Sequence, residues 1–294
     1  HGWADAFERA GGHYYPKMQV SVPFTPATGP RLLLRAGAAA NAEEAATLQG
    51  ALLSACIQCA EKTGASSLHL TFPTELEAGL MQEAGLLQRT GMQFHWENDG
   101  YDCFDDFLDS LASRKRKQIR RERREALAEG LTIHALSGSD IEERHWDAFF
   151  HFYQETANRK WGMPYLTREF FSLLGQNMGE QVVLMIVENA DRPIAGALNL
   201  MSGKTLFGRN WGAVEYHKFL HFELCYYQAI DYAIAHGLKR VEAGAQGEHK
   251  LLRGYLPCPT YSAHWIANPS FRDAIETYLE RETRQVDWEI EALG

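Results

Sequence analysis

The segment 242–255 holds the densest set of side chains that could do chemistry. It directly follows a predicted strand and combines acidic, imidazole and basic groups with two glycines that allow tight backbone turns. Lys250 and Arg253 are suited to binding an anion at the start of a helical turn, and Glu242 or His249 is suited to acting as a general base. Ligand sites favour loops of this kind at strand ends. The alternative is a helix-capping turn whose charges are only solvated.

A second polar segment, 208–223, runs into an apolar helix pattern. His217 and His221 are four residues apart, a spacing that places two imidazoles on one helix face and can bind zinc. No glutamate follows the first histidine as it does in H-E-x-x-H sites, so we predict no metal. Glu223 is flanked by Leu, Phe and Cys, where a carboxylate must be paired or catalytic. A structural ion pair, for example with Arg209, and general-base catalysis both stay open.

The third feature is a run of cations at 114–124, which holds eight basic residues and one acidic residue. It carries +7, whereas the other 21 basic and 37 acidic residues give the remainder −16. RNA, nucleotide phosphates or an anionic membrane surface would fit such a run. The alternative is a solvated helix face with ion pairs between turns. No aromatic residue interrupts it, which argues against stacking on single-stranded bases. The candidate docking residues are Arg114, Lys115, Arg116, Lys117, Arg120, Arg121, Arg123 and Arg124.

The composition of the whole chain is that of a globular protein. Of its 294 residues, 45% are hydrophobic and 23% are charged, which excludes disordered, collagen-like and fibrous chains. The net charge of −9 excludes a uniformly basic nucleic-acid binder. No apolar run approaches the roughly 18 to 20 residues that cross a bilayer. The chain starts at His1 without a signal-peptide pattern or an initiator Met, so we expect that an N-terminal piece is missing.

The five cysteines are an odd number in mostly apolar contexts. Cys56 and Cys59 form a C-x-x-C pair, a spacing that can be redox-active or bind zinc, but no second pair completes a metal site. We therefore predict buried structural thiols, no disulfide framework and a reducing, cytoplasmic setting.

Alternating strands and helices are predicted before residue 103. Asn41 and Thr74 are suited to capping two of the helices, and Gly64 and Gly85 to ending them. The predicted elements open on strands, so this region has the pattern of the back half of a domain. The expected strands are 17–24, 31–35, 67–72 and 86–96, and the expected helices are 41–62 and 74–83.

The longest helical stretch, 103–129, connects this region to the rest of the chain, and Ser113 is suited to capping a second helix within it. Beyond it, helices are expected at 140–157, 168–178, 217–236 and 269–291, and strands at 131–136, 182–188, 193–201, 204–209, 238–243 and 260–266. The three central strands form an antiparallel meander by their turn spacing. This element order is that of the GNAT (N-acetyltransferase) architecture, an α/β (α+β) fold. We therefore predict a partial first GNAT-like domain (1–102), a basic helical connector (103–130) and a second GNAT-like domain (131–294).

Several well-known motifs are absent from the sequence. It has no P-loop, no dinucleotide-binding G-x-G-x-x-G and no G-x-S-x-G elbow. The [QR]-x-x-G-x-[GA] pyrophosphate loop of acetyl-CoA-binding GNAT enzymes is also missing, and EYHKFLH (215–221) stands in its place.

Strings along nearly the whole chain resemble the FemAB-like, GNAT-related proteins known as predicted N-acyltransferases or peptidoglycan-biosynthesis-like proteins. The matching strings are PFTPATGPRLL (23–33), SSLHLTF (66–72), QFHW (93–96), FDDFL with SRKRK (104–117), YLTREFF (165–171), GRNWGA (208–213), LHFELCYYQAI (220–230), EAGAQGEHKLLRGYLP (242–257) and YSAHWI (261–266).

This resemblance implies two tandem GNAT-like domains with mixed, mainly antiparallel sheets, preceded in most members by further sequence. The wider Fem group transfers amino acids from aminoacyl-tRNA onto peptidoglycan precursors. Its C-terminal domain has a Phe-Lys motif shortly before Phe-Gly, and the nearest match here, with altered spacing, is His249-Lys250-Leu-Leu-Arg253-Gly254-Tyr255. The resemblance thus implies the lysine role for Lys250 or Arg253.

Our leading hypothesis is an N-acyltransferase without a permanently bound cofactor, which takes its acyl group from acyl-CoA or another activated donor. An amine attacks the activated acyl carbon, so the site must remove a proton, stabilise an oxyanion and protonate the leaving group. The catalytic candidates are Glu242 or Glu223 as base and Tyr255 or His249 as acid. The donor-binding candidates are Lys250, Arg253 and Gly247. The acceptor-binding candidates, for a small-molecule or peptide amine, are Arg209, Trp211 and Gln246. Replacing Lys250 and Arg253 together with alanine should abolish transfer and leave the fold intact.

Two other hypotheses stay open. One is a non-catalytic, degenerate GNAT module that binds a cell-wall or other anionic polymer through the basic helix, which the missing pyrophosphate loop favours. The other is an aminoacyl-tRNA-dependent ligase of the Fem type, in which the basic helix contacts tRNA. The salt dependence of tRNA binding and the stabilisation by CoA would separate them.

Overall fold

The computed structural model describes residues 2–127, 130–159, 162–244 and 247–294. The chain folds into two compact units, one formed by His1–Gln93 with Pro257–Gly294 and the other by Phe94–Leu256. We call them unit 1 and unit 2. The division differs from the predicted boundaries because the C-terminal strand and helix belong to unit 1 and the basic helix belongs to unit 2.

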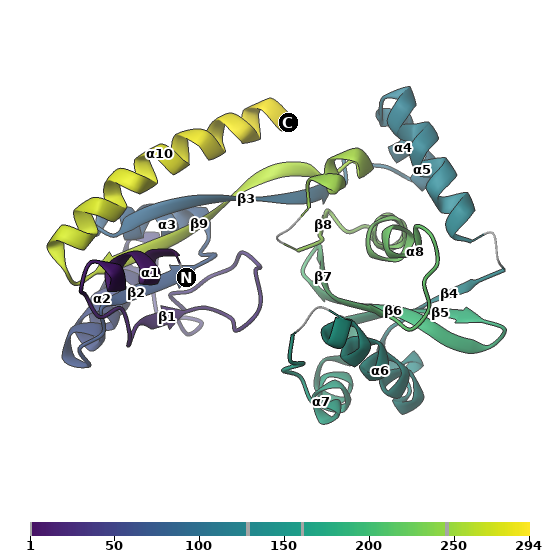
Figure 1. The fold of residues 1–294 in the computed structure, drawn as a ribbon, viewed down its shortest axis with the longest axis horizontal. Coiled ribbons are helices and arrows are strands. Elements are labelled where there is room, and N and C mark those ends of the chain that lie inside the picture. The colour runs from purple at the N-terminus through teal and green to yellow at the C-terminus, as the bar shows by residue number, and fades with distance from the viewer. Residues whose placement is uncertain (1, 128–129, 160–161, 245–246) are drawn as a thin grey trace. The chain divides into compact units, whose positions relative to one another are not determined.

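Unit 1 is an α/β unit whose strands run in the order β1-β2-β9-β3 (Figure 1). β1 lies parallel to β2, and β2 pairs with β9 in antiparallel register, with Ser67 opposite Ile266. The strands are β1 (Met18–Val20), β2 (Ser67–Thr71), β9 (Leu256–Ile266) and the first part of β3 (Leu87–Glu97). The helices are α1 (Gly2–Arg9), α2 (Ala42–Lys62), α3 (Glu75–Glu83) and α10 (Pro269–Leu293).

The core of unit 1 explains why β9 and α10 fold back onto this unit. Ala263 of β9 packs with buried residues of α2, β2 and α3, and Ile275 and Leu279 of α10 pack on Leu87 and Ile266. Burying such apolar side chains contributes about 1.5–3 kcal/mol each. The sheet therefore gains a strand from a segment almost two hundred residues after β2.

Unit 2 is built around the antiparallel strands β4 to β7, with β8 and the end of β3 completing the order β3-β8-β7-β6-β5-β4. Figure 1 shows α6 and α7 on one face of this sheet and α8 on the other. The strands are β4 (Thr132–Leu136), β5 (Val182–Asn189), β6 (Arg192–Ser202), β7 (Thr205–Ala213) and β8 (Arg240–Glu242). The helices are α4 (Phe104–Ser110), α5 (Ser113–Ala126), α6 (Glu143–Arg159), α7 (Arg168–Met178), α8 (Leu220–Phe222) and α9 (Gln228–Ala235).

Helical turns of other types complete the unit. A π-helical turn, Glu223–Tyr227, joins α8 to α9, and a 3-10 helix, Glu248–Arg253, precedes β9. Two shorter 3-10 turns lie at Gly138–Asp140 and Gly179–Gln181. π-helical turns are rare in proteins, and those that occur often lie at functional sites.

Two irregularities of the sheet in unit 2 open space on the α8 side. Leu198 lies opposite Asn210 but Asn199 lies opposite Gly208, so Arg209 is the additional residue of a β-bulge. β7 and β8 pair in parallel only from Thr205 to Phe207, and β7 then continues to Ala213. The bulge and the end of β7–β8 pairing coincide.

Most predicted elements are present, and Asn41 and Thr74 cap α2 and α3 as expected, while Thr167 caps α7. The prediction that the chain opens on strands is wrong, because α1 comes first. The strand predicted at 31–35 is also wrong: the backbone N–H groups of Arg31 and Leu32 donate to the Glu77 carboxylate instead of to a neighbouring strand. The 103–129 stretch forms two helices, α4 and α5.

The cysteine prediction is partly corrected. All five cysteines are free thiols, but within the C-x-x-C pair Cys59 is exposed and Cys56 is only half-buried. Among the described residues, no helix combines the length and the apolar character that a bilayer crossing demands.

Candidate active site

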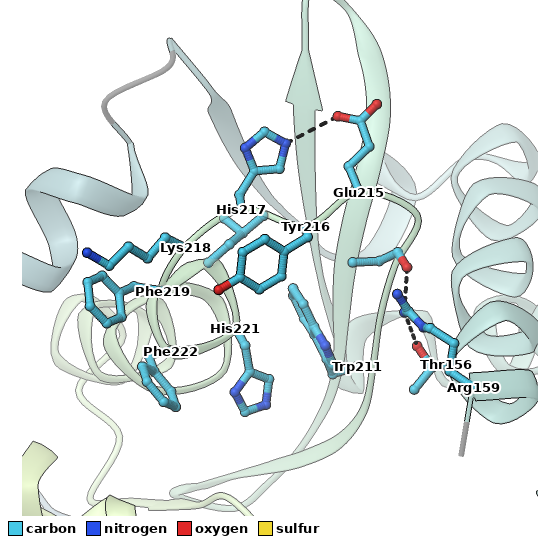
Figure 2. Close-up of a pocket in the computed structure, with 12 residues that line it drawn as sticks. Thr156, Arg159, Trp211, Glu215, Tyr216, His217, Lys218, Phe219, His221 and Phe222 are labelled. Carbon is cyan, nitrogen blue, oxygen red and sulfur yellow. Dashed lines mark hydrogen bonds and ion pairs between the residues drawn. The ribbon is translucent and has the colours of Figure 1, made fainter. Parts of the chain in front are cut away.

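A large pocket of about 550 Å³ opens in unit 2 around the segment that joins β7 to α8 (Figure 2). Its walls carry the aromatic rings of Trp211, Tyr216, Phe219 and Phe222. Phe219 has a left-handed backbone, with φ of 65°, immediately before α8. We call this cavity the aromatic pocket.

Polar groups lie at the edges of the aromatic pocket. His217 contacts the Glu215 carboxylate at 3.2 Å, and Arg159 donates to the carbonyl of Ala213 at 2.7 Å (Figure 2). Lys218 pairs with Glu125 of α5 at 2.7 Å. The pocket therefore combines an apolar interior with charged groups at its rim, as small-molecule sites commonly do.

A smaller pocket of about 140 Å³ lies where β7 and β8 separate. We call it the strand-end pocket. Trp211 and His221 line both pockets, so the two cavities adjoin. The other lining groups come from the bulge, the π-helical turn and the end of β8: Ala197, Leu198, Asn199, Gly208, Arg209, Asn210, Cys225, Tyr226, Ala243 and Gly244. Ligands of open α/β sheets bind in such crevices beyond the strand ends.

Tyr226 and His249 form a hydrogen-bonded pair at the wall of the strand-end pocket. The Tyr226 hydroxyl lies 2.8 Å from His249 Nε2. Tyr226 is buried, whereas His249 is exposed to solvent. Burial raises the pKa of Tyr226, and burial together with the charges of Arg253 and Lys250 lowers the pKa of His249. A neutral imidazole next to a protonated phenol is arranged to pass a proton from solvent to the pocket.

Lys250 lies beneath the same wall. Its side chain is 1% exposed, and Nζ donates to the carbonyl of Gly244 at 2.6 Å. Burial lowers the pKa of Lys250 to about 8 and raises that of the pocket residue Cys225 to about 12. An ammonium with this pKa changes its charge near neutral pH, as catalytic lysines do.

Gly247 is required by the geometry of this loop. Its φ of 113° is in a region that side-chain-bearing residues rarely adopt, and a Cβ there would collide with the His249 ring. Gln246, predicted to bind the acceptor, lies outside the described residues.

The surroundings of Arg253 indicate a role in holding the fold together. It is 3% exposed, its Nη2 donates to the Glu122 carboxylate at 2.8 Å, and its guanidinium stacks on the Phe222 ring at 3.4 Å. Tyr227 donates to the same carboxylate at 2.6 Å. Removing Arg253 would leave a buried carboxylate without its cation, so we now expect the Lys250/Arg253 double alanine variant to be destabilised.

Glu223 is likewise held in an ion pair. It is fully buried and accepts from Nε and Nη2 of Arg123 at 3.2 and 3.0 Å and from Gln228 at 2.8 Å. Arg123 also pairs with Asp231 at 2.5 Å. Of the two alternatives for Glu223, this geometry favours the structural ion pair, with Arg123 of the basic helix as partner.

Glu242 stands directly before the residues that line the strand-end pocket. Its side chain is 7% exposed and lies 3.8 Å from His95 Nε2 and 3.9 Å from Arg240 Nη1. Burial raises the pKa of Glu242 to about 7, although the charge of Arg240 opposes this shift. A carboxyl group with this pKa is suited to taking a proton at neutral pH.

The structure thus brings Arg209 and Trp211 to the pockets and His249 and Lys250 behind their wall. Tyr255, predicted as an acid, is fully buried, and its hydroxyl donates to the carbonyl of Tyr226 at 3.5 Å. Sequence reasoning missed Tyr226, because it occupies one position of an apolar helix pattern. The signal that could have found it is a polar-tipped side chain one turn after His221.

The basic run divides into two faces. Arg123 points into the ion pairs described above, and Arg116 and Arg120 pair with Asp109 and Asp105 of α4. Within residues 2–127 and the other described segments, no ion pair involves Arg114, Lys115, Lys117 or Arg124. Three of these four are exposed.

No group of three or more His, Cys, Asp or Glu side chains that could hold a metal occurs in the described part of the chain. His217 contacts Glu215, and His221 packs edge-on against Trp211 with ring centroids 5.3 Å apart. Both histidines line the aromatic pocket.

Comparison with known proteins decides the family. Residues 1–294 match the FemAB-like family, described as one of peptidoglycan biosynthesis/recognition. This chain belongs to the FemAB-like family. The FemAB-like resemblance predicted from the sequence is thereby confirmed. No curated protein matches the sequence.

Solved structures of the same fold include three with related titles. L-PGS from Bacillus licheniformis has a TM-score of 0.57 at 10% identity, covering 78% of each chain. The C-terminal domain of a putative lysylphosphatidylglycerol synthetase from Agrobacterium fabrum has 0.57 at 11%, covering 80% of this chain and 77% of that one. FemX has 0.55 at 14%, covering 87% and 85%. At these identities the likeness shows the fold, and the predicted mixed α/β class is confirmed.

Proposed function

We propose that this FemAB-like protein transfers an acyl or aminoacyl group from an activated ester or thioester to an amine acceptor, within unit 2. The adjoining aromatic and strand-end pockets are the observation that carries the proposal. Membership of a family of peptidoglycan biosynthesis/recognition supports it, and the fold shared with FemX and L-PGS is consistent with it.

The chemistry places specific demands on the strand-end pocket. The amine nitrogen bonds to the acyl carbon, the bond from that carbon to the donor oxygen or sulfur breaks, and the leaving atom takes up a proton. The Tyr226 hydroxyl is placed to give this proton and to regain one through His249. Asn210 and Arg209 line the same pocket and supply polar groups for the negative charge on the acyl oxygen.

The proton that leaves the amine must be taken up by a base that is deprotonated near pH 7. Glu242, with a pKa of about 7, is our proposed base, and Lys250, with a pKa of about 8, is the proposed donor-binding cation. Glu223, Tyr255 and Arg253 are assigned supporting roles because their polar groups are engaged in buried contacts.

The charge of the basic helix α5 bears on which donor the protein would use. The cations of α5 that have no ion-pair partner among the described residues favour a polyanionic donor, an aminoacyl-tRNA, over acyl-CoA. Acyl-CoA remains the second candidate, because the strand-end pocket and its polar groups would serve a thioester equally well.

The test presents purified protein with aminoacyl-tRNA or acetyl-CoA, each with a mixture of amino acids and short peptides, and follows donor consumption and product mass. We expect acceptor-dependent consumption of one donor and its loss in Lys250→Met. Arg144→Met serves as a control, since Arg144 is 71% exposed and pairs only with Glu142 among the described residues. Consumption of neither donor would favour a binding module that does no chemistry.

A further inference from the structure

Among the described residues that line the aromatic pocket, Arg159 is a cation without a carboxylate partner. Lys218 is neutralised by Glu125, and Glu215 is matched by Arg192 and His217. Arg159 donates to the Ala213 carbonyl at 2.7 Å and to the Thr156 hydroxyl at 3.4 Å, both neutral groups. Among the described residues, no carboxylate pairs with it.

The interior of the same pocket is apolar and aromatic. Trp211, Tyr216 and Phe222 line it together with Phe219, and the Arg159 guanidinium stands beside Trp211 at its rim (Figure 2). A ligand that fits must therefore carry an apolar body and one negative charge. A guanidinium presents a planar fork that matches a carboxylate with two parallel hydrogen bonds.

We infer that the aromatic pocket binds an amine acceptor that also carries a carboxylate, held by Arg159, with its apolar side chain against the rings. The inference rests on the proposed function, whose acceptor class it names. A phosphate group would bring nearly two negative charges, which the Arg159 guanidinium alone balances poorly. Lys218, another cation among the described lining residues, is already paired with Glu125 at 2.7 Å.

The size of the cavity agrees with this class of ligand. About 550 Å³ is within the range of pockets that enclose small molecules, and it suits one amino-acid residue with its substituent. The amino group would then lie toward Trp211 and His221, which the aromatic pocket shares with the strand-end pocket. The acceptor nitrogen would thereby face the proposed site of acyl transfer.

The test measures binding and needs no turnover. N-acetyl-L-phenylalanine and its amide, which differ in the carboxylate charge, are titrated into the full chain by calorimetry or saturation-transfer NMR. We expect the acid to bind at least about tenfold more tightly than the amide, as charge-assisted pairing implies. Arg159→Met should abolish that preference, Arg159→Lys should keep part of it, and Arg144→Met should keep all of it.

Equal binding of acid and amide, an unchanged preference in Arg159→Met, or no binding of either probe would overturn the inference. A folding defect in Arg159→Met would appear in its melting curve, and Arg159→Lys then decides the matter by its reduced preference. If the acid binds through Arg159 but no donor is ever consumed, the proposed function fails, whereas the carboxylate site at Arg159 stands. If transfer occurs equally to amines with and without a carboxylate, the proposed function stands and the inference about the acceptor fails.

Discussion

Each unit buries a cluster of polar side chains, and the two clusters differ in what they leave available. In unit 1, His69 Nδ1 and His264 Nδ1 are 2.7 Å apart, and Ser67, Tyr14 and Ser262 contact the outer nitrogens of the two rings. Burial lowers the pKa of His69 to about 4 and also lowers that of His264, so both rings are neutral near pH 7.

In unit 2, charged groups are buried instead. Glu122 with Arg253 and Glu223 with Arg123 join α5 to the π-helical turn and to the 3-10 helix that carries Lys250. Next to these complete pairs, Tyr226 meets an exposed histidine at the wall of a pocket. Burial of a polar group therefore does not by itself mark a site. The buried ion pairs hold elements in place, and the polar groups that also border a cavity are the ones placed to react.

The largest effect that would test this contrast is the loss of a closed pair. Arg253→Met leaves Glu122, 2% exposed, without its guanidinium, and should lower the free energy of unfolding by about 3–5 kcal/mol. Urea titration measures this loss. Arg272→Met, which breaks the surface pair with Glu276, should cost only about 0.3–0.5 kcal/mol. Adding Glu122→Gln to Arg253→Met should recover part of the stability, and a loss below about 1 kcal/mol in Arg253→Met would refute the structural role.

A smaller effect is expected in how pH changes the free energy of unfolding, to which the two clusters contribute differently. In the folded protein the pKa of His69 is about 4, and burial also lowers the pKa of His264 below the value of about 6.5 that both have when unfolded. Between about pH 4 and 6.5 the unfolded state therefore binds more protons. The stabilisation by the histidine pair is complete above pH 6.5 and declines as the pH falls toward 4, by up to about 1.4 kcal/mol per unit and group. Unfolding at a series of pH values measures this slope, which His69→Gln with His264→Gln should flatten.

Glu242 should act in the opposite direction. Its folded pKa of about 7 lies above the unfolded value of 4.5, so its contribution is present below pH 4.5 and declines as the pH rises through 7. Glu242→Gln should remove this trend, and the exposed His236→Gln should alter neither slope. A histidine-pair variant with the parent slope would contradict the assignment of neutral rings.

The smallest effect on stability is expected on the outer face of α5. Arg114→Gln, Lys117→Gln and Arg124→Gln together should change stability by less than about 0.5 kcal/mol, because these are solvated charges. If α5 docks tRNA, the same variant should reduce the slope of log K against log salt by roughly 2 to 3. Replacing Arg9, Arg281 and Arg284 with Gln removes the same charge elsewhere and should leave the slope unchanged. Equal slopes for both variants would remove α5 from the binding surface.

The sequence allowed prediction of the fold wherever local signals and tertiary packing agree. The caps at Asn41 and Thr74 and the meander β5–β7 have local causes, namely side chains that accept from free amides and alternation along the strand. The segment at Arg31 is different, because a distant carboxylate, Glu77, takes its backbone N–H groups. Such a distant partner cannot be predicted from hydropathy or residue spacing.

The site was predictable to a similar extent. The loop with Lys250 and His249 could be found because polar groups and glycines gather after a strand. The partner of Glu223 could not, since Arg123 lies one hundred residues away within a run that indicated a surface function. Arg159 gave no signal and Tyr226 stood in an apolar helix pattern, because only the folded strands and helices bring them to the two adjoining pockets.

The most direct measurement compares the transfer rates of Tyr226→Phe and Tyr232→Phe. Each variant loses one hydroxyl, but only Tyr226 lines the strand-end pocket and meets His249, whereas Tyr232 stacks on His236. With donor and acceptor saturating, the account predicts a rate about 100-fold lower for Tyr226→Phe, with an unchanged melting temperature and a normal rate for Tyr232→Phe. A parent-like rate in Tyr226→Phe would contradict the placement of the reaction in this pocket.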